Sequence, residues 1–155
     1  MSALVVARWT ILEARRRRLV LAGVVLSVAF VALSTRELGG GLRAQALAAL
    51  AWATAPIALG AASIFHPTWL DLGAETATLY LVLVAVTRPM PRLWPAVGVM
   101  AGLGLEAKYT IGTLLLALMA GLALTPQRHV LRTRGPWIAA GIALVLLLPN
   151  LIFGK

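Results

Sequence analysis

Apolar stretches alternate with short polar or proline-rich breaks along almost the whole chain. Each apolar stretch has roughly 15–22 residues, close to the ~20 that a helix needs to cross a bilayer, and tilt or local thinning accommodates the shorter ones. The pattern predicts an all-α fold, a polytopic transmembrane bundle of five to six helices. The stretches cover residues 19–35, 44–65, 69–87, 93–107, 109–125 and 137–153.

The number of helices depends on residues 93–125, which are too long for one ordinary span. Either two crossings meet at a turn near Lys108, or one long crossing is followed by a re-entrant piece. Within this stretch, 98-GVMAG-102 is a G-x-x-x-G pattern, which predicts the close approach of two helices. Four of the five tryptophans lie near predicted helix ends, where an aromatic belt would place them; these are Trp9, Trp69, Trp94 and Trp137.

Composition supports the membrane interpretation. The chain has 155 residues, of which 61% are hydrophobic and 12% charged, whereas a soluble domain is about 45–50% apolar and 25% charged. The net charge of +9 fits positively charged loops that face anionic lipid headgroups. No basic soluble domain suggests nucleic acid as a partner. The chain has no cysteine, which excludes disulfides and thiolate metal sites.

The basic run 15-RRRR-18 follows a short apolar segment, whereas a secretory signal places its charges first. We therefore interpret residues 1–18 as an interfacial or remnant basic segment, and residues 19–155 as the transmembrane domain. Charge alone leaves the orientation open. If the six stretches alternate, each side of the membrane receives seven basic residues: Arg36, Arg43, Arg88, Arg92, Arg128, Arg132 and Arg134 against Arg8, Arg15, Arg16, Arg17, Arg18, Lys108 and Lys155.

Three of the five acidic residues could carry chemistry. Glu13 and Glu37 lie in charged segments and are expected to be solvated. Asp71 and Glu75 are four residues apart at the start of an apolar helix, so they share one face. They could line a polar cavity at one membrane face. Alternatively, Asp71 compensates the helix dipole at the interface and Glu75 pairs with a basic neighbour.

Lys108 and Tyr109 lie within 102-GLGLEAKYTIG-112. At a turn on the membrane surface, the Lys108 amine could contact a phosphate as a point charge, and the amphipathic Tyr109 suits the same boundary. The alternative is that Lys108 only marks a helix end or neutralises Glu106. His66 is interpreted as a turn residue, because without a second His or Cys nearby the sequence predicts no metal site.

Several stretches in fixed order resemble one family. They are 31-VALSTRELGGGLRAQALAALAWATAP-56, 71-DLGAETATLYLVLVAVTRPMPRLW-94, 97-VGVMAGLGLEAKYTIGTLLLAL-118 and 136-PWIAAGIALVLLLPNLIF-153. Together they resemble the C-type-fold (GT-C) membrane glycosyltransferases, close to the family 39-like proteins that include the protein mannosyltransferases and the aminoarabinose transferases. The resemblance implies that the helices are part of a larger GT-C-type membrane domain.

The resemblance also implies a reaction. Such enzymes transfer a sugar from a polyprenyl-phosphate carrier to an acceptor at the non-cytoplasmic face of the cell (inner) membrane. Lys108 matches the lysine associated with holding the lipid phosphate, and Asp71 matches the aspartate associated with the active-site cavity. With Tyr109 and Glu75 they form the expected lipid-phosphate site, without a cofactor other than the lipid-linked sugar donor. The basic segments 36–43, 88–92 and 126–136 are then cytoplasmic.

Two departures from the family pattern qualify this expectation. The family's catalytic carboxylate lies in a large first loop upstream of every stretch matched here, and Glu106 occupies a position that is usually apolar. We therefore expect a fragment or degenerate relative that transfers nothing alone, with no catalytic residue assigned. The alternatives are a small transporter whose acids Asp71, Glu75 and Glu106 face one another, or a membrane assembly protein whose acids all pair with arginine.

Overall fold

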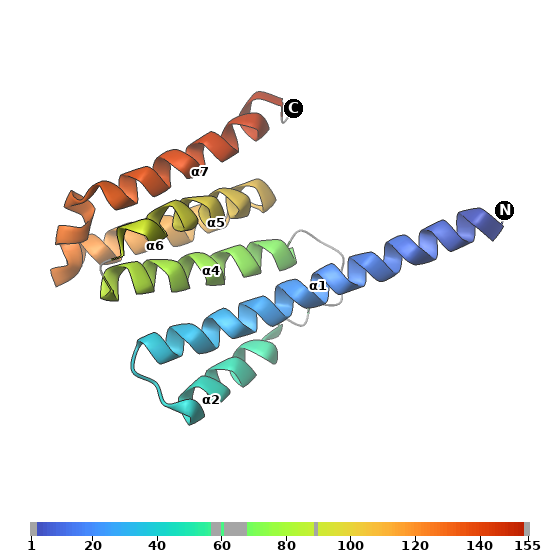
Figure 1. Cartoon of the computed structure of the whole chain (residues 1–155), viewed down its shortest axis with the longest axis horizontal. Coiled ribbons are helices and arrows are strands. Elements are labelled where there is room, and N and C mark those ends of the chain that lie inside the picture. Colours follow the sequence, from blue (N-terminus) through green and yellow to red (C-terminus); the bar gives the residue numbers. More distant parts are fainter. Residues whose placement is uncertain (1–2, 57–59, 61–67, 89, 154–155) are drawn as a thin grey trace.

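The structure is a computed structural model that describes residues 3–56, 60, 68–88 and 90–153. His66 and most of the second half of the predicted helix 44–65 lie outside these residues. The described chain is helical and contains no strand, which confirms the predicted all-α class (Figure 1). Its elements are α1 (Ala3–Glu37), α2 (Leu42–Ala53), α4 (Thr68–Thr87), η1 (Pro91–Leu93), α5 (Trp94–Ala107), α6 (Ile111–Leu124), η2 (Pro126–Arg132) and α7 (Arg134–Phe153).

Fewer of these helices are long enough to cross a membrane than the sequence pattern suggested. Among the described residues, three helical segments have the necessary length and apolar character, namely Arg18–Glu37, Leu70–Thr87 and Arg134–Ile152. The pair α6 and η2, bent by 115°, could form a fourth span. The 12-residue α2 and the 14-residue α5 and α6 reach only about 18–21 Å at 1.5 Å per residue, short of the ~30 Å hydrocarbon core.

The first helix does not break at the basic run. α1 continues from Ala3 through residues 15–18 to Glu37, and its N-terminal part extends beyond the bundle (Figure 1). The boundary at residue 18 therefore does not coincide with a change of secondary structure. Whether residues 1–18 act as a separate segment stays a prediction.

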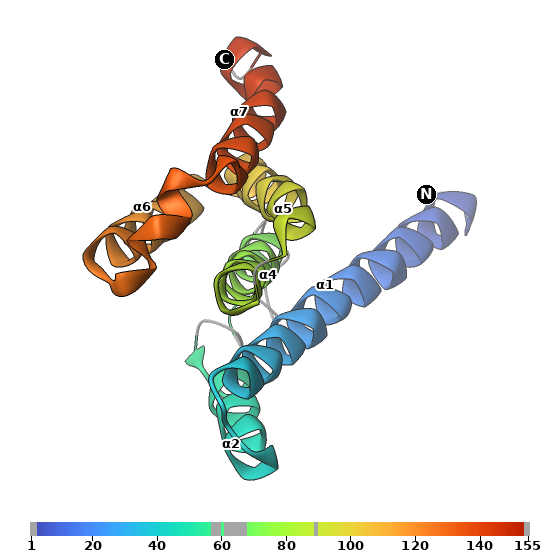
Figure 2. The ribbon, with the colours of Figure 1, turned by 60° about the vertical axis from the view of Figure 1, so that its left-hand side comes forward.

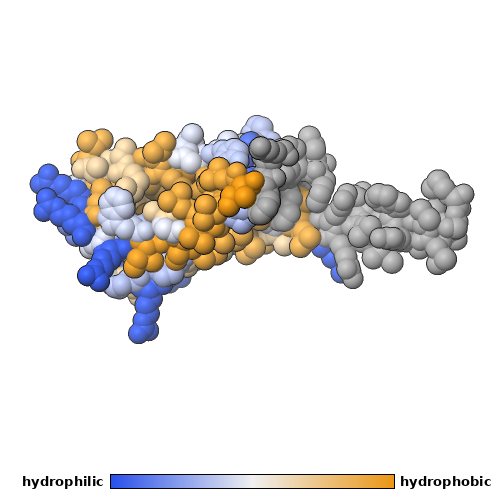
Figure 3. Space-filling model, turned by 90° about the horizontal axis from the view of Figure 1, so that it is seen from above, coloured by the Kyte–Doolittle hydropathy of each residue, from blue (hydrophilic) through white to orange (hydrophobic). Residues whose placement is uncertain are grey.

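The helices pack as a row of neighbours. α2 contacts α1, α1 contacts α4, α4 contacts α5, and α5 contacts α7. α6 lies to one side of this row with η2 (Figure 2). Seen from above, apolar residues cover the middle of the molecule and hydrophilic residues gather at the end opposite the N-terminus of α1 (Figure 3). This distribution fits a bundle whose apolar middle lies in a bilayer and whose visible hydrophilic end lies at a membrane surface.

Two glycines allow α5 to approach α7 closely, as the G-x-x-x-G pattern predicts. A Cβ on Gly98 would lie 2.6 Å from the carbonyl oxygen of Ala139 and 2.9 Å from Cβ of Ile142. A Cβ on Gly102 would lie 2.6 Å from Cδ1 of Leu146. Because neither position has room for a side chain, the packing role of the motif is confirmed.

Trp94 corrects the prediction of an aromatic belt. It is the first residue of α5, but its side chain is only 6% exposed and it packs in the core with Val82, Val97 and Ala139. Its indole fits against Gly135, where a side chain would collide with the ring. Trp137 behaves differently, since it is 64% exposed and its indole N–H donates to the carbonyl of Leu131 at 3.0 Å. A helix-end position therefore does not by itself place a tryptophan toward lipid.

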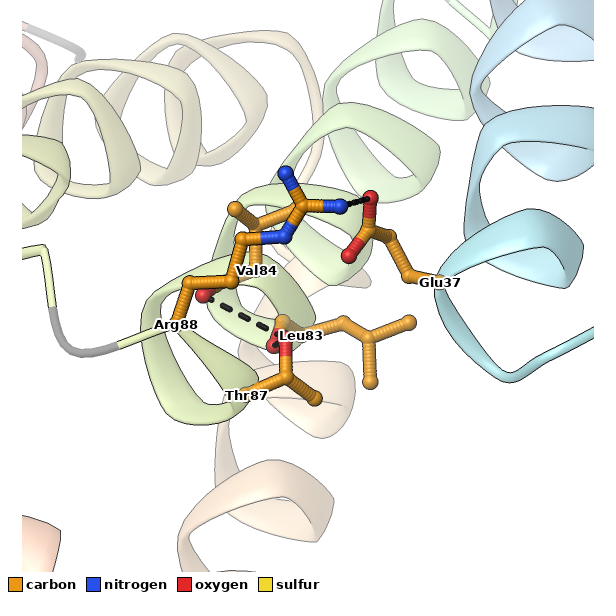
Figure 4. A network of polar contacts seen from close by, with 5 residues as sticks. All are labelled: Glu37, Leu83, Val84, Thr87 and Arg88. Carbon is orange, nitrogen blue, oxygen red and sulfur yellow. Dashed lines mark hydrogen bonds and ion pairs between the residues drawn. The ribbon is translucent and has the colours of Figure 1, made fainter.

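An ion pair joins the C-terminal ends of α1 and α4. The Arg88 guanidinium donates to a carboxylate oxygen of Glu37 at 2.7 Å (Figure 4). The prediction that Glu37 is solvated is wrong, because its side chain is only 9% exposed whereas Arg88 remains 57% exposed. The two residues are far apart in the sequence, so the pair fixes these helix ends relative to each other.

Candidate functional site

The candidate site begins with the turn between α5 and α6. Lys108 adopts an extended conformation after the last residue of α5, and its backbone N–H still donates to the carbonyl of Gly104 at 2.8 Å. Ile111 then starts α6, and its fully buried side chain packs against Gly104, where a Cβ would collide with it. The chain can turn back within three residues because Gly104 leaves room for Ile111. Residues 93–125 form two helices that meet at Lys108, as one alternative expected, but each helix has 14 residues and is too short to be a crossing by itself.

A hydrogen bond holds this turn against the first turn of α4. The hydroxyl of Thr110 donates to Oδ2 of Asp71 at 2.7 Å. The Asp71 side chain is 4% exposed, and its Oδ1 has no hydrogen-bond partner among the described groups. Asp71 therefore does not simply compensate its own helix dipole at an exposed interface. It reaches across to a second element and fixes the Lys108 turn at the same end of the bundle as the start of α4.

The remaining predicted residues lie at this same end. Glu75 follows Asp71 by one helical turn, is half-buried, and interacts electrostatically with Asp71 and with Lys108. Lys108 is exposed, and Tyr109 is 63% exposed. The structure thus brings together all four residues of the predicted lipid-phosphate site, with the carboxylates on α4 and the amine and phenol on the turn. Their roles stay a prediction.

Thr110 is the residue that sequence reasoning missed. It belongs to the Lys-Tyr-Thr segment, but a threonine between two apolar helices carries no distinctive signal until its partner is known. Because a buried carboxylate needs a hydrogen-bond donor, the position of Asp71 at the start of an apolar helix could have suggested a hydroxyl donor from a neighbouring turn. No residue spacing specifies which turn, because the contact joins residues 39 positions apart.

Glu106 does not belong to this cluster. One of its carboxylate oxygens accepts a hydrogen bond from the side-chain amide of Asn150 on α7 at 3.4 Å, and within residues 18–56, 70–88 and 90–152 it forms no ion pair with Lys108. This contact argues against a path of three acids that face one another. The assembly hypothesis expected every acid to pair with arginine, but Asp71 is bound by Thr110 and Glu106 by Asn150.

The arrangement offers an exposed cation and a phenolic hydroxyl beside a buried, anchored carboxylate. A lysine ammonium on a fixed turn can bind a phosphate as a point charge, and a tyrosine hydroxyl can donate a further hydrogen bond. Among the described side chains, no group of three or more His, Cys, Asp or Glu residues converges. The chemistry that these groups support directly is therefore the binding of an anionic headgroup.

Comparison with protein families identifies the chain. The model of the dolichyl-phosphate-mannose-protein mannosyltransferase family matches residues 5–153, from α1 to the end of α7. The chain belongs to this mannosyltransferase family. No curated protein and no solved structure matches it. The match confirms the resemblance to family 39-like glycosyltransferases that the ordered motifs indicated.

Membership in the mannosyltransferase family defines the general setting of the site. The family implies a lipid-linked sugar donor and a membrane environment. The three long apolar helices in the described part of the chain agree with a multi-pass integral membrane protein.

Proposed function

We propose that this chain forms part of the carrier site of a membrane glycosyltransferase. In the proposed reaction, a sugar moves from a polyprenyl-phosphate carrier to an acceptor at the non-cytoplasmic face of the membrane. The observation that carries the proposal is the hydrogen bond from Thr110 to Asp71, because it holds the exposed Lys108 turn beside the two carboxylates of α4. Family membership supports the lipid-linked donor.

Each residue of the site has a separate role in this proposal. The Lys108 ammonium binds the carrier phosphate, and the Tyr109 hydroxyl donates a second contact from the same turn. Asp71 is a positioning residue, because its buried carboxylate acts through Thr110. Glu75, one helical turn further along α4, interacts electrostatically with Lys108 and adds a second carboxylate beside the turn.

The two ends of the bundle also differ in the proposed orientation. The basic segments 36–43, 88–92 and 126–136 face the cytoplasm of a bacterial inner membrane, an orientation taken from the family resemblance because the basic residues are divided equally between the two sides. The Lys108 turn and the start of α4 then face the opposite side. That placement puts the carrier phosphate at the lipid–water boundary, where its polar headgroup belongs.

The proposal assigns carrier binding rather than sugar transfer to these residues. The catalytic carboxylate of related enzymes lies in a loop that corresponds to none of the matched stretches, so no residue here is proposed as a catalytic base. We therefore expect this chain by itself to bind the carrier phosphate without transferring sugar. A GT-C-type domain assembled around these helices would supply the missing groups.

The test is the binding of an undecaprenyl-phosphate analogue to the purified chain in detergent micelles. Lys108→Ala should weaken binding about tenfold, since a contact to a charged group is worth roughly 1.5–3 kcal/mol and solvent exposure reduces that value. Arg43→Ala is the matched control, because Arg43 is an exposed cation at the N-terminus of α2. Equal affinity for Lys108→Ala and the unmodified chain, or an equal loss in both variants, would remove the phosphate role.

A further inference from the structure

A cavity lies at the opposite end of the bundle from the Lys108 turn. It has a volume of about 350 Å³ and lies between the C-terminal end of α4, η1, η2 and the N-terminal end of α7. The wall of this cavity is mostly apolar, with polar and charged groups from η2 and the start of α7. Its lining includes Ala85, Trp94, His129, Val130, Arg134 and Ile138.

A hydrogen-bond donor without a partner among the described residues lies at this cavity. Trp94 is only 6% exposed, and its indole N–H donates to no group in the described residues. The edge of the ring that carries Nε1 lies against Gly135, and Gly135 lines this cavity. The indole N–H of a largely buried tryptophan usually has a hydrogen-bond partner. The N–H of Trp94 is therefore available to a ligand that brings an acceptor into the cavity.

The rim of the cavity is cationic. Arg134 and His129 line it, and both are exposed. Nδ1 of His129 lies 3.2 Å from the carbonyl oxygen of Pro126, so Nε2 can donate to a bound anion when the ring carries both protons. Among the residues with described side chains, Arg134 forms no ion pair, because Glu37, the acid at this end, is bound to Arg88.

Three further arginines are sequence neighbours of residues that line the cavity, and none has a carboxylate partner in the described structure. Arg92 belongs to η1, and Arg128 and Arg132 belong to η2, and all three are exposed. The hydrophilic end in Figure 3 is this end of the bundle. The local charge is thus strongly positive, so the acceptor that enters the cavity is anionic.

The position of the cavity suggests an amphiphilic occupant. The candidate span of α4 ends at Thr87 and that of α7 begins at Arg134, so the cavity lies at the boundary between the apolar and polar zones. Its apolar lining, here called the floor, includes Ala85, Val130 and Ile138, which offer apolar surface but no charge. A free anion would pair with the charged residues at the rim of the cavity but would leave the apolar floor in contact with water.

We propose that this cavity binds an anionic glycerophospholipid from the surrounding leaflet. The phosphate is held by Arg134 and His129 with a hydrogen bond from the indole of Trp94, and the start of an acyl chain covers the apolar floor. Basic pockets between helices at a membrane surface are suited to such headgroups. This site is separate from the proposed carrier site, because it lies at the other ends of α4 and α5.

The experiment measures which lipid the purified full chain retains. The chain is reconstituted in nanodiscs that contain equal amounts of phosphatidylglycerol and phosphatidylcholine, released, and analysed by native mass spectrometry. We expect preferential retention of phosphatidylglycerol. Arg134→Gln should lower the preference about fivefold, in line with about 1 kcal/mol per basic residue at an anionic surface. Arg43→Gln, an exposed arginine that does not line the cavity, should leave it unchanged.

Two further arms complete the test. His129→Gln is a second rim variant at an exposed position, so its loss of preference cannot be attributed to a core defect. Glycerophosphoglycerol, the headgroup without acyl chains, should not displace the bound lipid, since it cannot cover the apolar floor. Equal retention of both lipids, an equal effect of Arg134→Gln and Arg43→Gln, or full displacement by the free headgroup would each overturn the proposal.

Discussion

The contact between α5 and α7 can be tested with single methyl groups. Gly98→Ala adds one Cβ, which would lie 2.6 Å from the carbonyl oxygen and 2.9 Å from the Cα of Ala139. Both atoms belong to the backbone of α7, so the collision cannot be relieved by rotating a side chain. The two helices must separate or shift along each other. We therefore expect Gly98→Ala to destabilise the bundle.

The magnitude follows from two opposing contributions. In a helix interior, alanine is favoured over glycine by about 1 kcal/mol. Overpacking a tight contact costs about 1–3 kcal/mol. Gly141 lies in the interior of α7, and a Cβ added there would meet nothing within 4 Å, so Gly141→Ala experiences only the favourable contribution. The difference in unfolding free energy between the two variants should therefore be about 1–3 kcal/mol.

Gly102→Ala provides an intermediate case. The nearest atom to its added Cβ is Cδ1 of Leu146 at 2.6 Å, the far end of a side chain that can change rotamer, but the collision with Cβ of Leu146 at 2.9 Å would remain. The expected order of stability is Gly141→Ala, then Gly102→Ala, then Gly98→Ala. Unfolding in mixed micelles with increasing SDS, followed by the loss of helical circular dichroism, measures this order. Coincident transitions for all three variants would refute the close helix approach.

Two other predictions concern the Lys108 turn and the orientation. Thr110→Val leaves the 4%-exposed Asp71 without its hydrogen bond and should cost about 1.5–3 kcal/mol, whereas Thr125→Val, which removes an exposed hydroxyl bonded to its own helix, should cost much less in the same SDS titration. Because the chain lacks cysteine, Tyr109→Cys and Arg43→Cys each introduce a single exposed thiol. A membrane-impermeant maleimide should label Tyr109→Cys in intact spheroplasts and Arg43→Cys only after permeabilisation, and the reverse pattern would invert the proposed orientation.

The fold class and most of the helix boundaries could be predicted because they depend on local signals. Apolar length defined α4 and α7, and the charged or proline-containing breaks defined where α1 and α4 end. The polar pair at 106 and 108 correctly marked the turn between α5 and α6. The predicted number of membrane spans was too high because every apolar stretch was taken as a crossing. The stretch 93–107, for example, forms a helix that does not reach across a bilayer.

The contacts between helices could not be predicted in the same way. Nothing in the local sequence pairs Thr110 with Asp71 or Arg88 with Glu37, because each contact depends on the register between two helices. Trp94 shows the same limit. Its position at a helix end suited an aromatic belt, but the glycine at position 135 made room for its ring in the core.

The two long-range polar contacts explain how α4 can hold the candidate site in place. Asp71 binds the α5–α6 turn near the start of α4, and Arg88 binds the end of α1 just after α4 ends. Between them, small buried residues such as Ala74 and Ala77 let the neighbouring helices approach but offer few features that would oppose sliding or rotation. Contacts at both ends restrict both motions, because each bond is lost if the helix turns or shifts by one residue. The exposed Lys108 turn thereby occupies a defined position relative to Glu75, as a phosphate site requires.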